Sequence, residues 1–207
     1  MTVQVRPEHY RFERYDDLER WGSYWYQIRA ALRTEPRRVL EIGSGTRVFR
    51  SYLENRGIEV RSVDIDASRE PDFVADVTDL DHTLPAGVRF DCVAAFQVLE
   101  HLPHARFEDC LAGLARRAAP WCLLSLPHHG VALRMSVNVA GLRVSRGVSL
   151  PFPWQKRFDG EHHWELGWGH SVRSVTRTIG KYFEVVERGF VPENPYHYLW
   201  VLRSRAG

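Results

Sequence analysis

Residues 38–49 read RVLEIGSGTRVF, and this stretch decides the fold. Its first half is a short apolar run that predicts a buried strand. Gly43 and Gly45 then allow a tight turn and a close approach of a ligand to the backbone. A helix is expected from Val48 onward. Arg47 stands where a third glycine would be expected in a ligand-binding turn of this kind.

The composition is that of a globular protein with one domain, or one domain with an insertion: 207 residues, 44% hydrophobic and 26% charged. A formal net charge of +2 gives no electrostatic reason to expect or to exclude nucleic acid. Three cysteines, an odd number without a CxxC pair, argue against a disulfide framework or structural zinc and for a reducing compartment. The N-terminus lacks the apolar segment of a signal peptide, and no run approaches the ~18 apolar residues of a membrane helix. We therefore expect a soluble, cytoplasmic protein.

Helical and extended patterns alternate along the chain. Residues 16–33 predict an amphipathic helix, with apolar side chains three and four positions apart at Leu18, Trp21, Trp25, Ile28 and Leu32. Strands are expected at 37–42, 58–66, 71–77, 89–99 and 120–127, with helices at 48–57, 100–119 and 170–183. This spacing predicts a parallel sheet with helices on both faces. The last two apolar runs, 183–191 and 196–204, predict a closing antiparallel hairpin.

Residues 128–160 interrupt this alternation of helices and strands with glycines, prolines and scattered basic residues, and we interpret them as an inserted lid or substrate loop.

Asp64 ends the second expected strand, 19 residues after Gly45 (64 − 45). A carboxylate at that place can accept hydrogen bonds from two ribose hydroxyls. The alternative for Asp64 is a plain helix N-cap.

In their order and spacing, the segments VLEIGSGT, VDID, ADVTDLDHTLP, FDCVAAFQVLEHLP and LLSLP resemble the Rossmann-like, class I S-adenosylmethionine-dependent methyltransferases. The resemblance runs from about residue 37 to 127, and FEVVERGFV and YHYLWVLR fit the final reversed strand pair of that family. It implies an α/β fold with a seven-stranded, mostly parallel sheet, helices on both faces and an antiparallel last strand. The expected parts are an N-terminal helical cap (1–36), a cofactor-binding core (37–127), a substrate lid (128–169) and a C-terminal completion of the core (170–207).

The resemblance also implies S-adenosylmethionine as the cofactor. The matching positions are Glu41, Gly43, Ser44 and Gly45 for the amino acid end, Asp64 for the ribose, Ile65, Asp76 and Val77 for the adenine, and Phe96 and Gln97 for the methionine side. Aromatic residues on the N-terminal helix, Trp21, Tyr24 and Trp25, either close over the sulfonium cation or pack the helix on the core.

Arg47 departs from the family, which usually has glycine at this position. We expect Arg47 to adopt ordinary helical geometry in the first turn of the helix, without strain, and to point its guanidinium to solvent. The alternative is a contact with a carboxylate. A decayed, non-catalytic module that binds a partner is a further alternative, but the acidic and glycine positions of the expected cofactor site all remain.

Histidines supply the candidates for acid–base chemistry at the methyl acceptor. The segments QVLEHLPHA, SLPHHG and GEHHWELGWGH bring them to the carboxyl edge of the expected sheet. An unperturbed imidazole titrates near neutrality and can act as a general base. The candidate catalytic residues are His101, His128, His129 and His163, although for any single one a capping or solvent-facing role is the simpler explanation.

A metal-dependent alternative rests on residues 97–101, QVLEH. They are similar to the E-x-x-E-H pattern of small-RNA 3′-end 2′-O-methyltransferases, and Glu and His side chains can hold a divalent cation. Gln97 replaces the first Glu of that pattern, which removes a charged ligand. This alternative is an RNA 2′-O-methyltransferase with a metal at Glu100, His101 and a histidine from 162–170, whereas the leading interpretation has no metal ligand.

The insertion is expected to bind the methyl acceptor, and its basic residues suit an anionic metabolite. The candidate substrate-binding residues are Trp25, Arg134, Trp154, His162 and Trp164; for the aromatic ones, packing is the alternative. The leading hypothesis is an S-adenosylmethionine-dependent methyltransferase of a small polar or anionic metabolite. It leaves open the acceptor, the methylated atom and the oligomeric state, and it disfavours nucleic acid and membrane partners.

Overall fold

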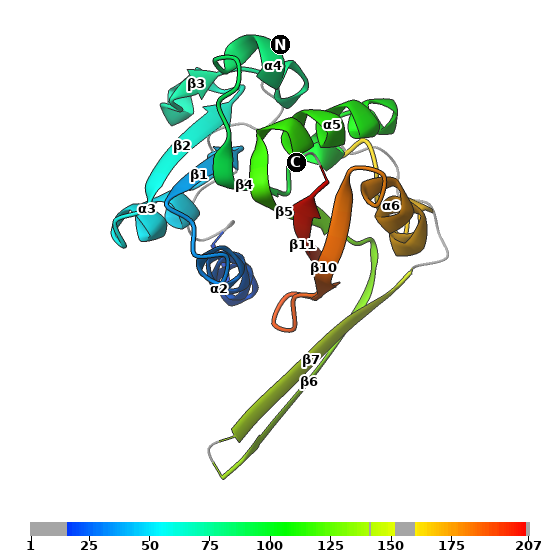
Figure 1. Cartoon of the computed structure of the whole chain (residues 1–207). Helices are drawn as coiled ribbons and strands as arrows, with labels where there is room; N and C mark the ends of the chain where they lie inside the picture. The colour runs from blue at the N-terminus through cyan, green and yellow to red at the C-terminus, as the bar shows by residue number, and fades with distance from the viewer. Residues whose placement is uncertain (1–15, 141, 152–159, 206–207) are drawn as a thin grey trace.

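The computed structural model describes residues 16–140, 142–151 and 160–205, and it shows an α/β protein built on one central sheet (Figure 1). The strand order is β10-β11-β5-β4-β1-β2-β3. The strands are β1 (Arg38–Ile42), β2 (Glu59–Asp64), β3 (Phe73–Val74), β4 (Phe90–Phe96), β5 (Ala118–Pro127), β10 (Phe183–Phe190) and β11 (His197–Ser204). In this described sheet β11 runs in the opposite direction to the other six strands. The expected seven-stranded, mostly parallel, Rossmann-like sheet is therefore confirmed.

Each face of the sheet carries its own apolar core. Helices α2 (Leu18–Leu32) and α3 (Val48–Glu54) cover one face, where Ala31 and Phe49 pack against β-strand residues such as Val39. Helices α4 (Leu80–Thr83), α5 (Phe107–Arg117) and α6 (Val172–Ile179) cover the other. The chain runs outward from β1 to β3 on one side and returns to β4 on the other. The carboxyl ends of β1 and β4 thus flank the switch point where ligands bind in such sheets.

Helix α2 does not bury the face that its apolar spacing indicates. Leu18, Trp21 and Trp25 are 89%, 46% and 56% exposed. The helix instead turns small and polar residues to the protein interior: Ser23, Gln27, Ala30 and Ala31. Of the expected apolar stripe, only Ile28 and Leu32 pack against the core. Of the two alternatives for Trp21 and Trp25, their exposure does not support packing on the core; small side chains face the sheet instead and let the helix lie close to it.

The helix expected at 100–119 begins later. Two short 3₁₀ turns, η4 (Leu99–His101) and η5 (His104–Arg106), precede α5. Leu102 is extended, with φ −109° and ψ 151°, because the following Pro103 disfavours helical geometry at this residue. Glu100 and His101 consequently lie in a turn directly behind β4.

Most of the insertion is not a loop but a long antiparallel hairpin of β6 (Gly130–Val139) and β7 (Leu142–Pro151). Its strands pair from Gly130 opposite Pro151 to Val139 opposite Leu142, and the hairpin projects from the body as an arm (Figure 1). A short parallel pair, β8 (Glu165–Leu166) and β9 (Gly169–His170), follows at the sheet edge. The sequence analysis did not predict these two strands, and the role of the insertion as a substrate lid stays a prediction.

Arg47 is the N-cap of α3 and adopts a left-handed conformation, with φ 63° and ψ 11°. The expectation of ordinary helical geometry is therefore wrong. Arg47 N donates to Ser44 O at 2.8 Å and closes the turn before the helix. The guanidinium lies 3.3 Å from the carboxylate of Glu70, and both side chains are exposed, so this pair contributes little.

Replacing Arg47 by glycine tests the strain in this turn. The left-handed conformation costs a non-glycine residue about 1–2 kcal/mol, and glycine avoids this cost. Glycine also makes the unfolded chain more flexible, which lowers the free energy of unfolding by about 0.5–1 kcal/mol. Arg47→Gly should therefore raise the free energy of unfolding by roughly 0.5–1 kcal/mol in urea denaturation. The control, Arg47→Ala, keeps the strain and should not exceed the wild type. A glycine variant less stable than the alanine variant would contradict this explanation.

Candidate active site

The turn after β1 is shaped by two glycines with different surroundings. Gly43 has φ +80°, and a Cβ added to it would lie 2.6 Å from Val98 Cγ2. Gly43 N donates to Val63 O at 2.8 Å. A Cβ on Gly45, at φ +46°, would meet no described atom within 4 Å. Gly43 is thus required by the packing of β1 against the segment behind β4, whereas Gly45 borders open space that a ligand can enter.

Asp64, at the end of β2, holds this turn in place. Its Oδ2 accepts a hydrogen bond from Ser44 N at 2.6 Å, and its Oδ1 accepts one from Asp66 N at 2.9 Å. The N-cap of the following 3₁₀ turn η2 (Ala67–Arg69) is Asp66, so the capping alternative for Asp64 is wrong. Each carboxylate oxygen has a second lone pair, which leaves acceptor capacity for a ligand hydroxyl.

Glu41, in β1, is a buried carboxyl group at the same edge. It is 4% exposed, and its Oε2 has no hydrogen-bond partner among the described residues. Burial raises the pKa of Glu41 to about 8, because an isolated buried carboxylate is poorly solvated. A carboxyl group in this state gains a partner if a cationic ligand group enters the site.

The other expected cofactor residues follow neighbouring strands at this carboxyl edge. Asp76 caps the 3₁₀ turn η3 (Val77–Asp79) by accepting from Thr78 N at 2.9 Å. The Phe96 ring at the end of β4 contacts the Phe49 ring edge-on, with centroids 5.1 Å apart. The remaining positions are half-buried Ile65, buried Val77 and Gln97, whose Nε2 donates to Ser125 Oγ at 3.0 Å. From α2, the Tyr24 hydroxyl reaches Thr46 Oγ1 at 3.0 Å, so that Tyr24 is the aromatic residue of this helix that touches the turn.

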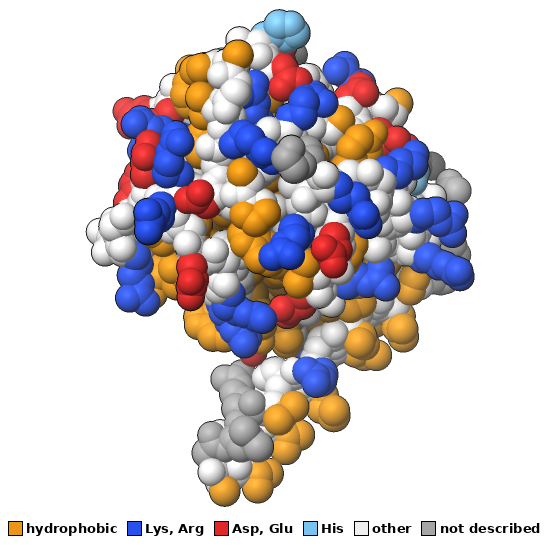
Figure 2. Space-filling model, viewed as in Figure 1, with side chains coloured by type: hydrophobic (Ala, Val, Ile, Leu, Met, Phe, Trp, Pro, Cys, Tyr) orange, Lys and Arg blue, Asp and Glu red, His pale blue; other side chains and the backbone are white. Residues whose placement is uncertain are grey.

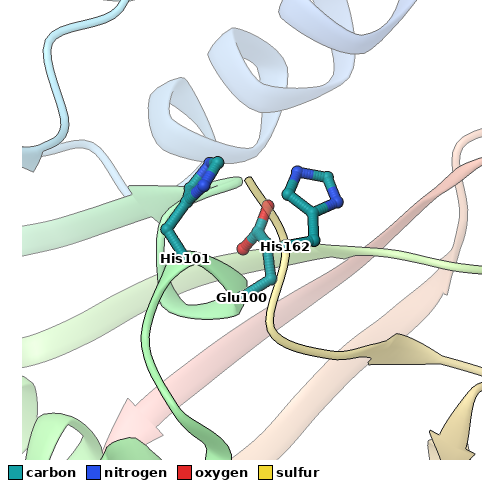
Figure 3. A group of neighbouring side chains, drawn as sticks. All are labelled: Glu100, His101 and His162. Carbon is teal, nitrogen blue, oxygen red and sulfur yellow. The ribbon is translucent and has the colours of Figure 1, made fainter. Parts of the chain in front are cut away.

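A cluster of ionisable side chains lies directly behind β4, and we call Glu100, His101, His162, Glu165 and Tyr196 the Glu100 cluster. The Glu100 carboxylate lies between the two imidazoles, and all three side chains point the same way (Figure 3). One ligand atom from each of Glu100, His101 and His162 lies within 4.8 Å of the others. His162 Nδ1 is 2.8 Å from Glu165 Oε1, which also accepts a hydrogen bond from the Tyr196 hydroxyl at 3.2 Å. The cluster therefore combines possible bases, acids and metal ligands.

Burial controls the charges in the Glu100 cluster. Glu100 is fully buried, and neither carboxylate oxygen has a hydrogen-bond partner among the described residues. Burial raises the pKa of Glu100 to about 7, and the nearby His162 opposes this rise. Burial also raises the pKa of Tyr196, so its hydroxyl stays protonated. Next to it, burial lowers the pKa of His197 well below its usual value, and the charge of Arg20 on α2 acts in the same direction.

Two backbone contacts fasten the segment 160–166 to the turn behind β4. His163 N donates to Glu100 O at 2.9 Å, and His101 Nδ1 donates to Glu161 O at 3.0 Å. A carbonyl oxygen can only accept, so this bond places the hydrogen of a neutral His101 ring on Nδ1 and the lone pair on Nε2. The contact of His162 Nδ1 with a carboxylate favours the same tautomer. Both imidazoles thus hold a defined acceptor nitrogen.

The structure separates the histidines that the sequence groups together. His101 belongs to the Glu100 cluster. His128 is buried, with Nδ1 2.9 Å from Ser149 Oγ, and burial lowers its pKa. His129 donates its backbone N–H to Leu166 O at 2.7 Å, and the side chain of His163 is exposed. Their catalytic roles stay predictions, with His101 the candidate that lies beside other ionisable groups behind β4.

The candidate substrate residues are also dispersed. His162 joins the Glu100 cluster. Trp164 is 3% exposed in the core, where its Nε1 donates to Leu102 O at 3.2 Å, which favours the packing alternative. Trp25 is exposed on α2 beneath the Arg29 guanidinium, and Arg134 pairs with Glu19 at 2.9 Å. Trp154 lies outside the described residues.

Sequence reasoning did not select Glu165, Tyr196, His197 or Arg20. Glu165 was visible in the segment GEHHWELGWGH, but its contact with His162 depends on the turn at 160–166. The positions of Tyr196 and His197 in the sequence could have identified them as candidates for the site. They begin an antiparallel last strand, and the start of such a strand lies at the edge where the parallel strands end, since His197 pairs with Pro127. No feature of the sequence pointed to Arg20, because the orientation of α2 was not predictable.

The sheet, its glycine turn and the acidic residues at the strand ends define a Rossmann-like methyltransferase. The chain belongs to the methyltransferase domain family, whose model matches residues 8–163, about three quarters of its length. This confirms the resemblance to the class I S-adenosylmethionine-dependent methyltransferases and favours an enzyme over a non-catalytic module. No curated protein matches the sequence.

Solved structures of methyltransferases share the fold. The N-methyltransferase NodS from Bradyrhizobium japonicum, bound to S-adenosyl-L-homocysteine, is 14% identical, with TM-score 0.62 over 98% of this chain and 94% of that chain. The glycopeptide N-methyltransferase MtfA, complexed with S-adenosyl-L-methionine, is 17% identical, with TM-score 0.57 over 86% and 92%. Magnesium protoporphyrin IX methyltransferase from Synechocystis, with bound cofactor, is 15% identical, with TM-score 0.55 over 89% and 81%. Among the described residues, no helix has the length and apolar character needed to cross a membrane.

Removing the hydroxyl of Tyr196 tests the packing of the Glu100 cluster. Tyr196→Phe deletes a hydrogen bond to the buried Glu165 carboxylate, and bonds to charged groups contribute about 1.5–3 kcal/mol. We expect the free energy of unfolding to fall by roughly that amount in urea denaturation. Tyr198→Phe, two residues further along the chain, is the matched control, because the Tyr198 hydroxyl forms no hydrogen bond with any described residue. Equal losses in the two variants would show that the Glu165 bond contributes nothing specific.

Proposed function

We propose that this methyltransferase binds S-adenosylmethionine across the carboxyl ends of β1 to β4 and transfers its methyl group in line to a small polar metabolite held at the Glu100 cluster. The main observation behind the proposal is that two candidate sites lie next to each other at the carboxyl edge of the sheet. Glu41 and the open turn at Gly45 form the first, and the Glu100 cluster behind β4 forms the second. The Gly43–Val98 packing contact joins them, because Val98 lies two residues before Glu100.

The proposed cofactor pose assigns a partner to each polar group at the edge. The cofactor ammonium would meet Glu41, whose buried Oε2 lacks a described partner. The carboxylate end would lie over the backbone of Ser44 and Gly45, and the ribose hydroxyls would meet Asp64. The adenine would lie between Ile65 and Val77 with its amino group near Asp76, while Phe96 and Gln97 would line the methionine side. Tyr24 would close this site from α2.

The proposed acid–base step uses an imidazole of the Glu100 cluster. As the sulfur–methyl bond breaks and the bond from methyl to the acceptor oxygen or nitrogen forms, the acceptor loses one proton, and the sulfonium becomes a neutral thioether. His162 is suited to take that proton because Glu165 accepts from its Nδ1 and stabilises the imidazolium that forms. His101 is the second candidate. An anionic group on the acceptor would find the positive charge of Arg20 nearby, which supports a polar or anionic metabolite.

The cofactor site should show a specific dependence on pH. The pKa of Glu41 is about 8 in the free protein, so the side chain is mostly protonated at pH 6, and an ammonium partner favours its ionised form. Binding should then release a proton, and the affinity for S-adenosylmethionine should rise roughly tenfold between pH 6 and pH 7. Calorimetry in buffers of different ionisation enthalpy measures both quantities.

Two variants sharpen this experiment. Glu41→Gln should bind more weakly and lose the pH dependence, whereas Glu59→Gln, an exposed change at the far end of β2, should retain both affinity and slope. An unchanged pH slope in Glu41→Gln would remove Glu41 from the ammonium site. Absence of binding by the wild-type protein to S-adenosylmethionine and to S-adenosylhomocysteine would overturn the proposed cofactor function itself.

A second candidate function is a metal-assisted transfer, and the geometry of the Glu100 cluster specifically favours its metal component. Two imidazoles and one carboxylate form a ligand set used for divalent iron, manganese and zinc. Both imidazoles are oriented by Nδ1 contacts with oxygen atoms, as is usual for metal-bound histidines. Such an ion would lower the pKa of an acceptor hydroxyl. An RNA acceptor, which the sequence alternative includes, has no comparable support here.

Metal titration separates the two candidates. If the cluster holds an ion, calorimetry of chelator-treated protein with Mn²⁺, Zn²⁺ or Co²⁺ should give one site, which His162→Ala loses. The adjacent His163→Ala is the matched control and should bind like the wild type, because the His163 side chain is exposed and outside the group of three. Methyl transfer that is indifferent to chelators, with no metal bound, would remove this candidate and leave the cluster to acid–base chemistry.

A further inference from the structure

The hairpin of β6 and β7 exposes one continuous apolar face. Side chains alternate along β6, and every second residue from Val131 to Val139 is apolar and about half exposed or more. Their partners on β7 continue the same face, with Val131 opposite Leu150, Leu133 opposite Val148 and Val137 opposite Val144. The exposed members are Val131, Leu133, Met135, Val137, Val139, Val144, Val148 and Leu150, which we call the apolar face. Figure 2 shows hydrophobic side chains along the projecting arm.

The opposite face of the hairpin contacts the body of its own subunit. Arg134 forms an ion pair with Glu19 at 2.9 Å and donates to Glu193 O at 2.8 Å. A Cβ added to Gly147 would lie 2.7 Å from Pro195 Cγ, which shows how closely β7 approaches the loop before β11. This face thus touches the body at Arg134 and Gly147, whereas Ser136 and Asn138, further along β6, are exposed. A two-stranded ribbon is marginal in water without a covered hydrophobic face.

We propose that a second copy of this chain covers the apolar face, so that the hairpins of two subunits pack face to face. Eight side chains, each about half exposed, offer roughly 700 Å² per copy, close to the ~800 Å² per partner of a standard interface and above the patch size usual for monomers. Apolar faces of two ribbons can stack about 10 Å apart like the layers of a sandwich. A two-fold axis makes one such face complementary to itself.

The charge within the apolar face argues for protein rather than lipid as the occupant. Arg146 lies opposite Met135, midway along the hairpin, and its side chain is exposed. A central arginine is costly in a lipid environment but common in protein interfaces, where its aliphatic stem packs and its guanidinium reaches the rim. The dimer does not depend on the proposed catalytic roles, since none of the residues of the apolar face belongs to the proposed active site.

Sedimentation equilibrium of the full chain tests the dimer. The wild type should reach twice its 24.1 kDa mass in the micromolar range, and Leu133→Glu with Val137→Glu should raise the dissociation constant by roughly 100-fold or more, because the charges would be buried. The matched control, Ser136→Glu with Asn138→Glu, adds the same charge to the other face of β6 and should remain dimeric. Val144→Glu with Val148→Glu repeats the test from β7, and unchanged circular dichroism and cofactor binding exclude unfolding.

Three results would overturn the proposal. The first is a wild-type monomer at concentrations up to about 100 µM, well above the dissociation constant of a standard interface. The second is a monomer that co-sediments with phosphatidylglycerol vesicles through the apolar face, which would assign this face to a membrane surface. The third is dissociation of the polar-face control as complete as that of the apolar-face variants.

Discussion

The hydrogen bond from Ser44 N to the Asp64 carboxylate is the constraint on which the arrangement of the site depends. It ties the turn after β1 to the end of β2, while Gly43 packs the same turn against Val98 behind β4. The ends of β1, β2 and β4 are thereby fixed relative to one another before any ligand binds. Asp64 thus has a structural role in the turn, in addition to the ribose contact that we propose for it.

The Glu100 cluster shows the cost and the use of burying ionisable groups. A fully buried carboxyl group without a described hydrogen-bond partner is unfavourable for folding, and packing elsewhere must offset it. The return of residues 160–166 to the turn behind β4 orients two imidazoles through contacts of their Nδ1 atoms with oxygen atoms. Polar groups that are oriented in advance in this way are typical of binding and catalytic sites.

The places of the strands along the chain and the positions of Gly43, Gly45 and Asp64 at strand ends were predictable, since buried strands and tight turns leave local patterns in the sequence. The orientation of α2 was not, because its large aromatic residues are exposed and its small residues face the sheet. The left-handed Arg47 was hidden for a related reason: propensity favours glycine there, but the turn geometry, not the residue, sets the backbone angle. The Glu100 cluster joins residues more than 90 positions apart. The sequence placed Glu100, His101 and the segment that contains His162 at the same edge, but it could not show which side chains of that segment meet the turn behind β4.

The two ends of the β6–β7 hairpin lie side by side, with Gly130 paired to Pro151. The chain therefore enters and leaves the paired part of the hairpin at one place, so the hairpin can change in length without breaking a strand of the main sheet. The hairpin and the main sheet can therefore change independently in evolution, because β6 and β7 form a two-stranded sheet of their own.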